Sequence, residues 1–200
     1  MLSGLTPVSV GGRGRSGAEP RTARRSRPTP YIRYRPIPAV IAVAGGKGGS
    51  GKTTTTLGLA RALSRRGARV VAADADWDLP NLARLAAETG PEPAPVGAGR
   101  RAAEPDAPTV LDVVRGNEPV RPDRSGPTIL AAPDAPRSVD AGGTFDALDG
   151  AKPAGTPVLL DSPAGASPDV AAPLRAADRA LIVTPLRRAA LRDAAKTAAI

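Results

Sequence analysis

Two of the four lysines in this chain lie five positions apart in one glycine-rich stretch, AGGKGGSGKTTTT, at residues 44–56. Arginine carries most of the positive charge elsewhere, which indicates that these positions specifically require lysine. Residues 46–53, GKGGSGKT, match the phosphate-binding pattern G-x-x-x-x-G-K-[ST]. In that pattern backbone N–H groups surround the phosphate oxygens, Lys52 contacts the terminal phosphates and the Thr53 hydroxyl holds Mg²⁺. The alternative is a flexible glycine turn.

Carboxylates follow two other apolar segments of the sequence. Asp74 ends the run VVAAD, with Asp76 and Asp78 close behind it, and Asp161 ends the run PVLLD. Taken alone, either segment also fits a solvated turn or a helix cap. The carboxyl ends of parallel strands meet at one edge of a sheet, where ligands bind. We therefore expect these carboxylates to lie beside the glycine loop.

The elements that must position these residues alternate between strands and helices. Short apolar, β-branched runs predict buried strands at 39–44, 68–74, 127–133, the start of 156–165, and 179–185. Helical periodicity predicts helices at 53–67, 79–90, 109–116, 167–178 and 187–200, with a weak helix near Phe145. Strands that are apolar on both faces predict a mostly parallel central sheet covered on both sides. The expected fold class is therefore a three-layer α/β P-loop NTPase.

The composition excludes several classes of site. The chain has no cysteine and no histidine, which excludes disulfides, thiolate metal sites, cysteine nucleophiles and histidine bases. No stretch approaches the ~20 apolar residues of a membrane span. The first thirty residues lack the apolar core of a signal peptide, so we expect a cytoplasmic protein.

The net charge of +9 is concentrated at one end. Residues 1–37 carry eight arginines and one glutamate, whereas residues 38–200 carry twenty basic and eighteen acidic side chains. We expect 1–37 to be a disordered basic tail. It fits an arm that binds DNA or anionic lipid, an ordinary disordered extension, or a non-native leader if translation begins near Val40. Flexible linkers are expected near 91–108 and 132–155.

The glycine loop resembles the deviant Walker A motif, K-G-G-x-G-K-[ST], of the ParA/MinD family of ATPases. The matching residues, with Gly46 before them, are Lys47, Gly48, Gly49, Ser50, Gly51, Lys52, Thr53 and Thr54. In that family the first lysine reaches across a nucleotide-sandwiched dimer to the partner's phosphates. The resemblance thus implies that Lys47 acts in trans, and that the chain binds ATP as a homodimer.

Both acidic segments extend this resemblance. The D-x-D segment is similar to the family's first switch, which implies that Asp76 orients the attacking water and Asp74 supports the Mg²⁺ shell. The PVLLDSPAG segment is similar to a Walker B strand and second switch. It implies that Asp161 holds Mg²⁺ through water and that the Gly165 N–H senses the γ-phosphate. Residues 178–194 resemble the family's next strand–helix unit, near the base.

The implied function is a Mg·ATP-binding, slowly hydrolysing dimeric switch in division, partitioning or positioning, with a protein activator or cargo. Family members usually continue into another strand, whereas this sequence stops at Ile200, so we expect a sheet trimmed at the C-terminus. The last helix is mostly alanine, unlike the amphipathic membrane helix of MinD-type proteins. Two alternatives are an ATP-dependent small-molecule synthetase of the same superfamily and a degenerate nucleotide-binding interaction module.

Overall fold

The structure is a computed structural model, and the fold described here covers most of the chain after the basic tail. It describes residues 40–90, 107–122, 126–134, 138–165 and 168–200. The expected tail at 1–37, and nearly all of the expected linker at 91–108, lie outside the described residues.

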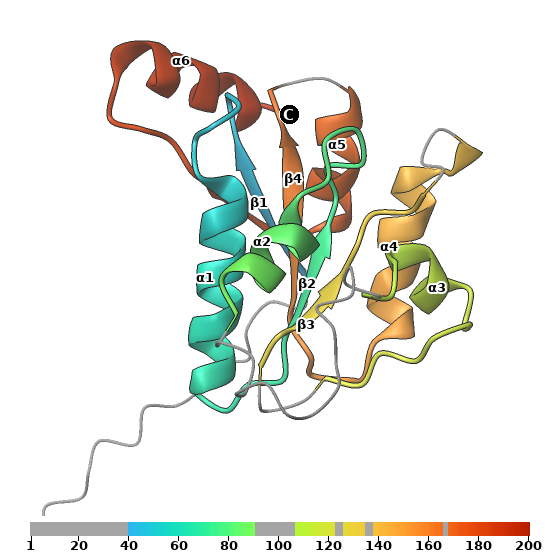
Figure 1. The fold of residues 1–200 in the computed structure, drawn as a ribbon. Coiled ribbons are helices and arrows are strands. Elements are labelled where there is room, and N and C mark those ends of the chain that lie inside the picture. The colour runs from blue at the N-terminus through green and yellow to red at the C-terminus, as the bar shows by residue number, and fades with distance from the viewer. Residues whose placement is uncertain (1–39, 91–106, 123–125, 135–137, 166–167) are drawn as a thin grey trace, which may run out of the picture. The chain divides into compact units, whose positions relative to one another are not determined.

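The described strands form one five-stranded sheet in which every pairing is parallel (Figure 1). The strands are β1 (Val40–Gly45), β2 (Val71–Asp74), β3 (Thr128–Leu130), β4 (Val158–Ala164) and β5 (Arg179–Ile182). Their order across the sheet is β3-β2-β4-β1-β5. The predicted α/β fold with a parallel sheet is therefore confirmed.

Helices cover both faces of this sheet (Figure 1). They are α1 (Lys52–Arg65), α2 (Leu82–Glu88), α3 (Val110–Val114), α4 (Ala141–Ala151), α5 (Pro168–Ala176) and α6 (Arg188–Thr197). Because side chains alternate along a strand, neighbouring residues pack into two different hydrophobic clusters, one on each face of the sheet. Ala72 and Leu159 pack with α1 and α2, whereas Ala73 and Leu160 pack with α3 and α4. None of the helices in the described ranges has the length and apolar character needed to cross a bilayer.

The helix after the glycine loop ends where its sequence predicts. Gly67 donates its backbone N–H to Ser64 O at 2.8 Å, and the Ala68 N–H reaches Leu63 O at 3.1 Å. This pair of bonds is a Schellman motif, which satisfies the last carbonyls of α1. The motif turns the chain directly into β2 and so brings Asp74 to the same edge of the sheet as the loop.

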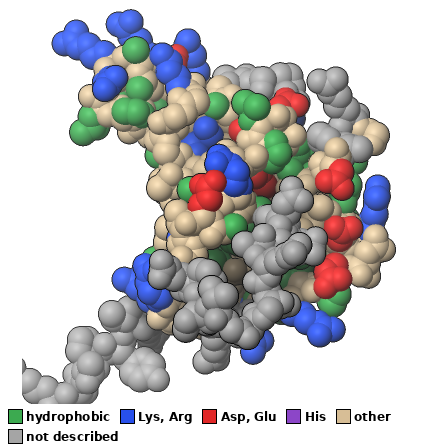
Figure 2. All heavy atoms as spheres, in the orientation of Figure 1, with side chains coloured by type: hydrophobic (Ala, Val, Ile, Leu, Met, Phe, Trp, Pro, Cys, Tyr) green, Lys and Arg blue, Asp and Glu red, His purple; other side chains and the backbone are tan. Residues whose placement is uncertain are grey.

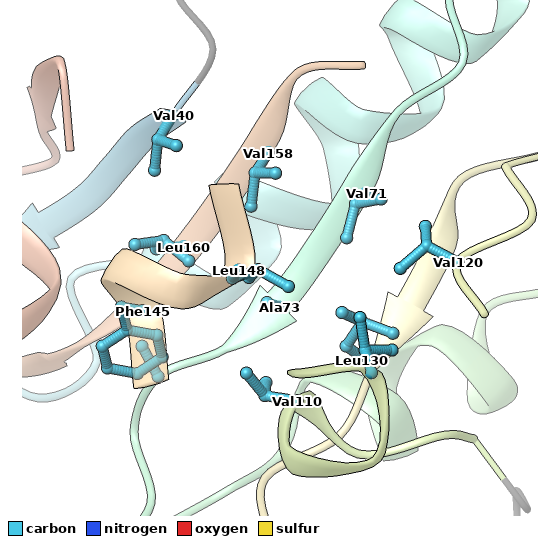
Figure 3. Close-up of a cluster of buried hydrophobic side chains, with 12 residues drawn as sticks. Val40, Val71, Ala73, Val110, Val120, Leu130, Phe145, Leu148, Val158 and Leu160 are labelled. Atoms are coloured by element: carbon cyan, nitrogen blue, oxygen red, sulfur yellow. The ribbon is translucent and has the colours of Figure 1, made fainter. Parts of the chain in front are cut away.

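The segment at 132–155, expected to be a flexible linker with a weak helix near Phe145, contains the regular helix α4 at Ala141–Ala151. The helix near Phe145 is confirmed, and it is longer than its sequence pattern indicates. Its three glycines weaken the helical pattern by about 1 kcal/mol each. Packing compensates, since Phe145 and Leu148 are each only 1% exposed and lie in the core beneath the sheet (Figure 3). Tertiary burial therefore overrides local propensity in this segment.

The last strand also departs from the expectation of burial on both faces. Residues 179–181 of β5 are exposed, and Leu181 is 40% exposed. Within the described residues, β5 pairs only with β1 and forms one edge of the sheet. The expectation of complete burial was wrong for this strand because no described element covers its outer side.

Candidate nucleotide-binding site

The candidate site lies at the carboxyl ends of two neighbouring strands whose following helices pack on opposite faces of the sheet. β1 and β4 pair with each other; β1 leads into α1 on one face, and β4 leads into α5 on the other. Such a switch point opens a crevice at the carboxyl ends of the strands, where α/β proteins bind ligands. The phosphate loop follows the carboxyl end of β1, and Gly165 follows the carboxyl end of β4.

The predicted phosphate loop joins β1 directly to α1. Its glycines include Gly49 with φ 72° and Gly51 with φ 92°, a left-handed backbone that favours glycine. Gly51 is also the N-cap of α1, and no side chain caps this helix. Ser50 Oγ is buried without a hydrogen-bond partner among the described residues. An uncapped helix start behind an open glycine loop suits an anion such as a phosphate.

The first turn of α1 carries the predicted lysine and hydroxyls. Lys52 is only 8% exposed, Thr53 is half-buried and Thr54 is exposed. None of the salt bridges between described residues includes Lys52. Its charge nevertheless acts on the nearby carboxylates, because it lowers the pKa values of both Asp76 and Asp161. The structure thus brings together the predicted lysine and two of the predicted carboxylates.

Asp161 lies in β4, beneath the first turns of α1. It is 2% exposed, and its Oδ1 accepts a hydrogen bond from Thr56 Oγ1 at 3.1 Å. Burial raises the pKa of Asp161 to about 6, although hydrogen bonds from Thr53 and Thr56 and the charge of Lys52 oppose the rise. A buried carboxylate of this kind gains from a nearby cation.

This donor set fits a magnesium ion that a nucleotide brings with it. The hydroxyl of Thr53 and the carboxylate of Asp161 are hard oxygen donors, which Mg²⁺ prefers. The described residues contain no group of three or more His, Cys, Asp or Glu side chains that could hold a metal ion. Mg²⁺ that binds together with a nucleotide usually takes one or two protein ligands, with phosphates and water as the others, so Thr53 and Asp161 would suffice to hold it.

Asp74, the last residue of β2, lies opposite Asp161 in the register of the two strands. Its Oδ1 accepts the N–H of Asp76 at 3.1 Å, and its Oδ2 accepts the N–H groups of Asn81 and Leu82, each at 2.9 Å. Burial and the charge of Asp161 raise the pKa of Asp74 to about 7, despite these bonds. Asp74 therefore ties the following loop to the sheet. Its role in the Mg²⁺ shell stays a prediction.

Asp76 lies in the loop between β2 and α2, close enough to Lys52 for that charge to act on it. Its Oδ1 accepts the Leu79 N–H at 3.3 Å, which closes a short turn. Burial raises the pKa of Asp76. The predicted water-positioning carboxylate is thus partly buried beside the lysine, and its role stays a prediction.

The Lys47 side chain extends from the loop toward α6. Its Nζ lies 3.1 Å from Asp193 Oδ2, and 57% of the Lys47 side chain is exposed. The helix packs close at this point, because a Cβ on Gly46 would lie 2.4 Å from the backbone of Asp193. The predicted action of Lys47 on a partner's phosphates would require it to leave Asp193.

The outer side of α6 carries basic and apolar side chains together (Figure 2). Leu191 is 47% exposed, and Leu186, just before the helix, is 93% exposed. The inner side of the helix reaches the second predicted switch, where Thr197 Oγ1 donates to Gly165 O at 3.0 Å. The Gly165 N–H donates to Gly45 O at 3.2 Å. The predicted contact of this N–H with a γ-phosphate would replace that bond.

Two site contacts are absent from the sequence-based predictions. Thr56 lies one turn after Lys52, so helical spacing places it on the side of α1 that faces the site, where it contacts Asp161. Asp193 is the only acidic residue after Asp178, but its pairing with Lys47 depends on where α6 docks. Helical spacing was therefore a usable signal for the first contact, whereas the second left none.

Comparison with known proteins identifies the family. Residues 41–192 match the CobQ/CobB/MinD/ParA nucleotide binding domain. The chain belongs to this family. Because the match includes the phosphate loop and both acidic segments, the resemblance inferred from those motifs is confirmed.

Individual members of the family extend the comparison. The chain is 30% identical over 159 residues to septum site-determining protein MinD of Synechocystis, covering 78% of this chain and 56% of that protein. The cell division ATPase MinD of Pyrococcus furiosus matches with a TM-score of 0.60 and 26% identity, over 80% of this chain and 65% of that one. Cobyrinic acid a,c-diamide synthase of Mycobacterium smegmatis, with bound ADP and magnesium, matches with a TM-score of 0.50 and 26% identity, over 82% and 69%. The chain spans about half the length of the curated relatives it matches.

Proposed function

We propose that this chain binds Mg·ATP, forms a homodimer around it and hydrolyses it slowly as a switch. One observation carries the proposal: the buried Lys52 at the uncapped start of α1 stands near two carboxylates, Asp161 in β4 and Asp76 in the loop after β2. A second lysine lies in the same glycine loop. Lysine, hydroxyl and carboxylate groups suffice for phosphoryl transfer, which depends on positioning and charge neutralisation.

The proposed roles follow the placement of each group. Lys52 and the N–H groups of the loop bind the phosphates, and Thr53 and Asp161 hold Mg²⁺, which neutralises phosphate charge. Asp76 positions the attacking water beside Lys52. Lys47 leaves Asp193 and contacts the phosphates bound by the partner subunit. Gly165 responds to the γ-phosphate through its N–H, and a protein activator or cargo reads the resulting state.

The likeness to MinD proteins supports a role in division or intracellular positioning. The basic tail supplies a second contact, with DNA or anionic lipid, in this proposal. Comparing the chains that start at Met1 and at Val40 for binding to DNA and to anionic vesicles tests this role of the tail. Equal binding by both chains would remove the tail from the proposal.

A synthetase is the second candidate, because the chain shares its fold with an amide-forming synthase. A synthetase needs convergent polar groups for its small substrate. A hollow beside α3 has polar lining residues, namely Thr109, Asp112, Arg115, Asp134 and Ser138. None of the predicted phosphate-site residues is among the residues that line it, which favours the switch over the synthetase.

The test compares wild type with Lys47→Ala and Asp76→Ala. We expect ATP, but not ADP, to shift wild type to a dimer in sedimentation, with slow release of phosphate. Either substitution should reduce hydrolysis to a slow residual rate, and Asp76→Ala should retain the ATP-bound dimer. Hydrolysis that is indifferent to Lys47 would refute the shared site. ATP binding without turnover, even with candidate activators added, would favour the degenerate interaction module.

A further inference from the structure

The loop that carries Asp76 is held to the sheet at both of its ends. Asp74 binds the N–H of Asp76 at one end and the N–H groups of Asn81 and Leu82 at the other. Between these points the Asp76 carboxylate accepts a single N–H, that of Leu79, at 3.3 Å. The hydrogen bonds of Asp74 therefore fix the two ends of the loop, whereas its middle has one long bond.

Trp77, the residue after Asp76, supplies a further contact. Its indole N–H donates to Asp74 O at 3.0 Å, and its ring centroid lies 5.2 Å from that of Phe145, with the planes tilted by 50°. Tilted aromatic pairs at this spacing attract beyond the burial of their surface. The Trp77 ring therefore has a preferred orientation and is more than apolar filling.

Phe145 is a rigid partner for this ring. It lies on α4, is 1% exposed and belongs to the buried cluster beneath the sheet, where it is enclosed by strand and helix residues (Figure 3). The ring of Trp77 packs against the same cluster while its backbone stays in the exposed loop. The pair thus connects the loop to a helix that contributes no residue to the phosphate site.

We propose that Trp77 and Phe145 are positioning residues that hold Asp76 in place for hydrolysis, with α4 as the anchor. This inference rests on the proposed function, because it assigns Asp76 a water to position. A carboxylate that orients water must be fixed closely, since a displacement of about 1 Å can lower a rate 100-fold. The residue next to Asp76 is well placed to limit the movement of its backbone, because consecutive Cα atoms are held about 3.8 Å apart.

The contact can be observed without any catalysis, because Trp77 is the only tryptophan in the chain. Its fluorescence therefore reports this loop alone. Phe145→Leu keeps an apolar group in the core but removes the ring pair. We expect it to shift the Trp77 emission to longer wavelength and to increase quenching by acrylamide. Unchanged emission and quenching would show that Phe145 does not hold the Trp77 ring.

The effect on hydrolysis separates positioning from stability. We expect Phe145→Leu to lower kcat about 10-fold while KM changes less than about 3-fold, because ATP binding does not use the ring pair. Leu148→Ala, also buried on α4, is the control for lost core packing and should keep kcat within about 3-fold at a temperature where both variants are folded. Trp77→Leu, at a partly exposed position, should reproduce the kcat loss if Phe145→Leu fails to fold.

Coupling to Asp76 decides between positioning and a general effect. In an Asp76→Asn background, Phe145→Leu should lower the residual rate less than about 2-fold, because the group that it positions is already removed. Equal losses in both backgrounds, or equal losses from Phe145→Leu and Leu148→Ala, would overturn the proposal. If wild type releases no phosphate, the proposed function and the positioning role fail together. The fluorescence measurement then still decides whether the anchor exists.

Discussion

The two lysines of the phosphate loop lie in opposite environments. Lys52 stands with Thr56 and Asp161 in what we call the floor of the site, where Lys52 is 8% exposed and Asp161 is 2% exposed. Lys47 stands with Asp193 in what we call the rim, where 57% of the Lys47 side chain is exposed. Burial raises the pKa of Asp161. In contrast, the hydrogen bond from Lys47 lowers the pKa of Asp193. A further cation beside Asp161 would therefore stabilise the floor. In the rim, Lys47 and Asp193 already neutralise each other through an exposed ion pair that water can replace.

The largest expected effect is a difference in ADP affinity between variants that lack one or the other lysine. Lys52→Ala should weaken ADP binding by about 100-fold or more, because it removes from a buried position the charged donor that the proposed function assigns to the phosphates. Lys47→Ala should change ADP binding to the monomer by less than about 3-fold, because its charge lies at the exposed rim. Calorimetric titration of both variants with Mg·ADP measures the difference. Equal losses would contradict the division between floor and rim.

The floor should also make the stability of the nucleotide-free protein depend on pH. Because burial raises the pKa of Asp161 to about 6, above its ordinary 3.8, the folded chain holds its proton over a range where the unfolded chain has lost it. The free energy of unfolding should therefore fall as pH rises from about 4 to 6, by up to about 3 kcal/mol from this group. Asp74, with its pKa raised to about 7, extends the fall to about pH 7.

Urea unfolding of the metal-free protein between pH 4.5 and 8 measures this fall, and Asp161→Asn should reduce its slope. Asp146→Asn, which removes an exposed carboxylate of α4, is matched in charge and should leave the slope as in wild type. If the free energy of unfolding of Asp161→Asn falls with pH as steeply as that of wild type, burial does not oppose the ionisation of Asp161.

A smaller effect is expected from the hydroxyl that supports Asp161. Thr56→Val preserves shape but removes the donor at 3.1 Å from Asp161 Oδ1. At pH 8, where Asp161 is charged, this loss should lower the free energy of unfolding by about 1–2 kcal/mol, and by less at pH 5. Thr55→Val, one position earlier in α1, is the matched control. An equal loss at both pH values would assign the effect to packing, or to the bond that the same hydroxyl makes with Lys52 O at 3.0 Å, and not to the carboxylate.

The floor could be predicted from the sequence because each part has a local pattern. The loop from Gly46 to Thr53 is a contiguous motif, and Asp74 and Asp161 each end an apolar run, so a parallel sheet brings them to one edge. The predicted and observed bounds of the elements differ by only a few residues. The first strand, for example, was predicted at 39–44 and lies at Val40–Gly45.

The rim and the anchor of the Asp76 loop could not be predicted in the same way. Lys47 and Asp193 meet because of how α6 docks on Gly46, and a contact between such distant segments leaves no periodic pattern. The pairing of Trp77 with Phe145 depends on α4, whose glycines weaken its helical pattern. These contacts depend on tertiary packing that propensity and spacing do not encode.

The smallest expected effect tests how replaceable the rim contact is. Asp193→Asn should lower the free energy of unfolding only slightly, because an ion pair exposed to solvent contributes little. Any loss should vanish at 1 M salt, which screens exposed pairs. Because Asp193 also lies 3.5 Å from Lys196, Lys196→Ala is the control that removes the second pair and leaves Lys47 held.

The same variant connects the rim to the proposed dimer. If Lys47 must leave Asp193 to reach a partner's phosphate, Asp193→Asn removes a competing contact and should favour ATP-dependent dimerisation by up to about 3-fold. Lys196→Ala should leave dimerisation as in wild type. Weaker dimerisation of Asp193→Asn would mean that Asp193 supports the dimer state and does not compete with it. The small size of the expected gain follows from the exposure of the pair, since a contact that costs little to break can also be exchanged readily between two subunits.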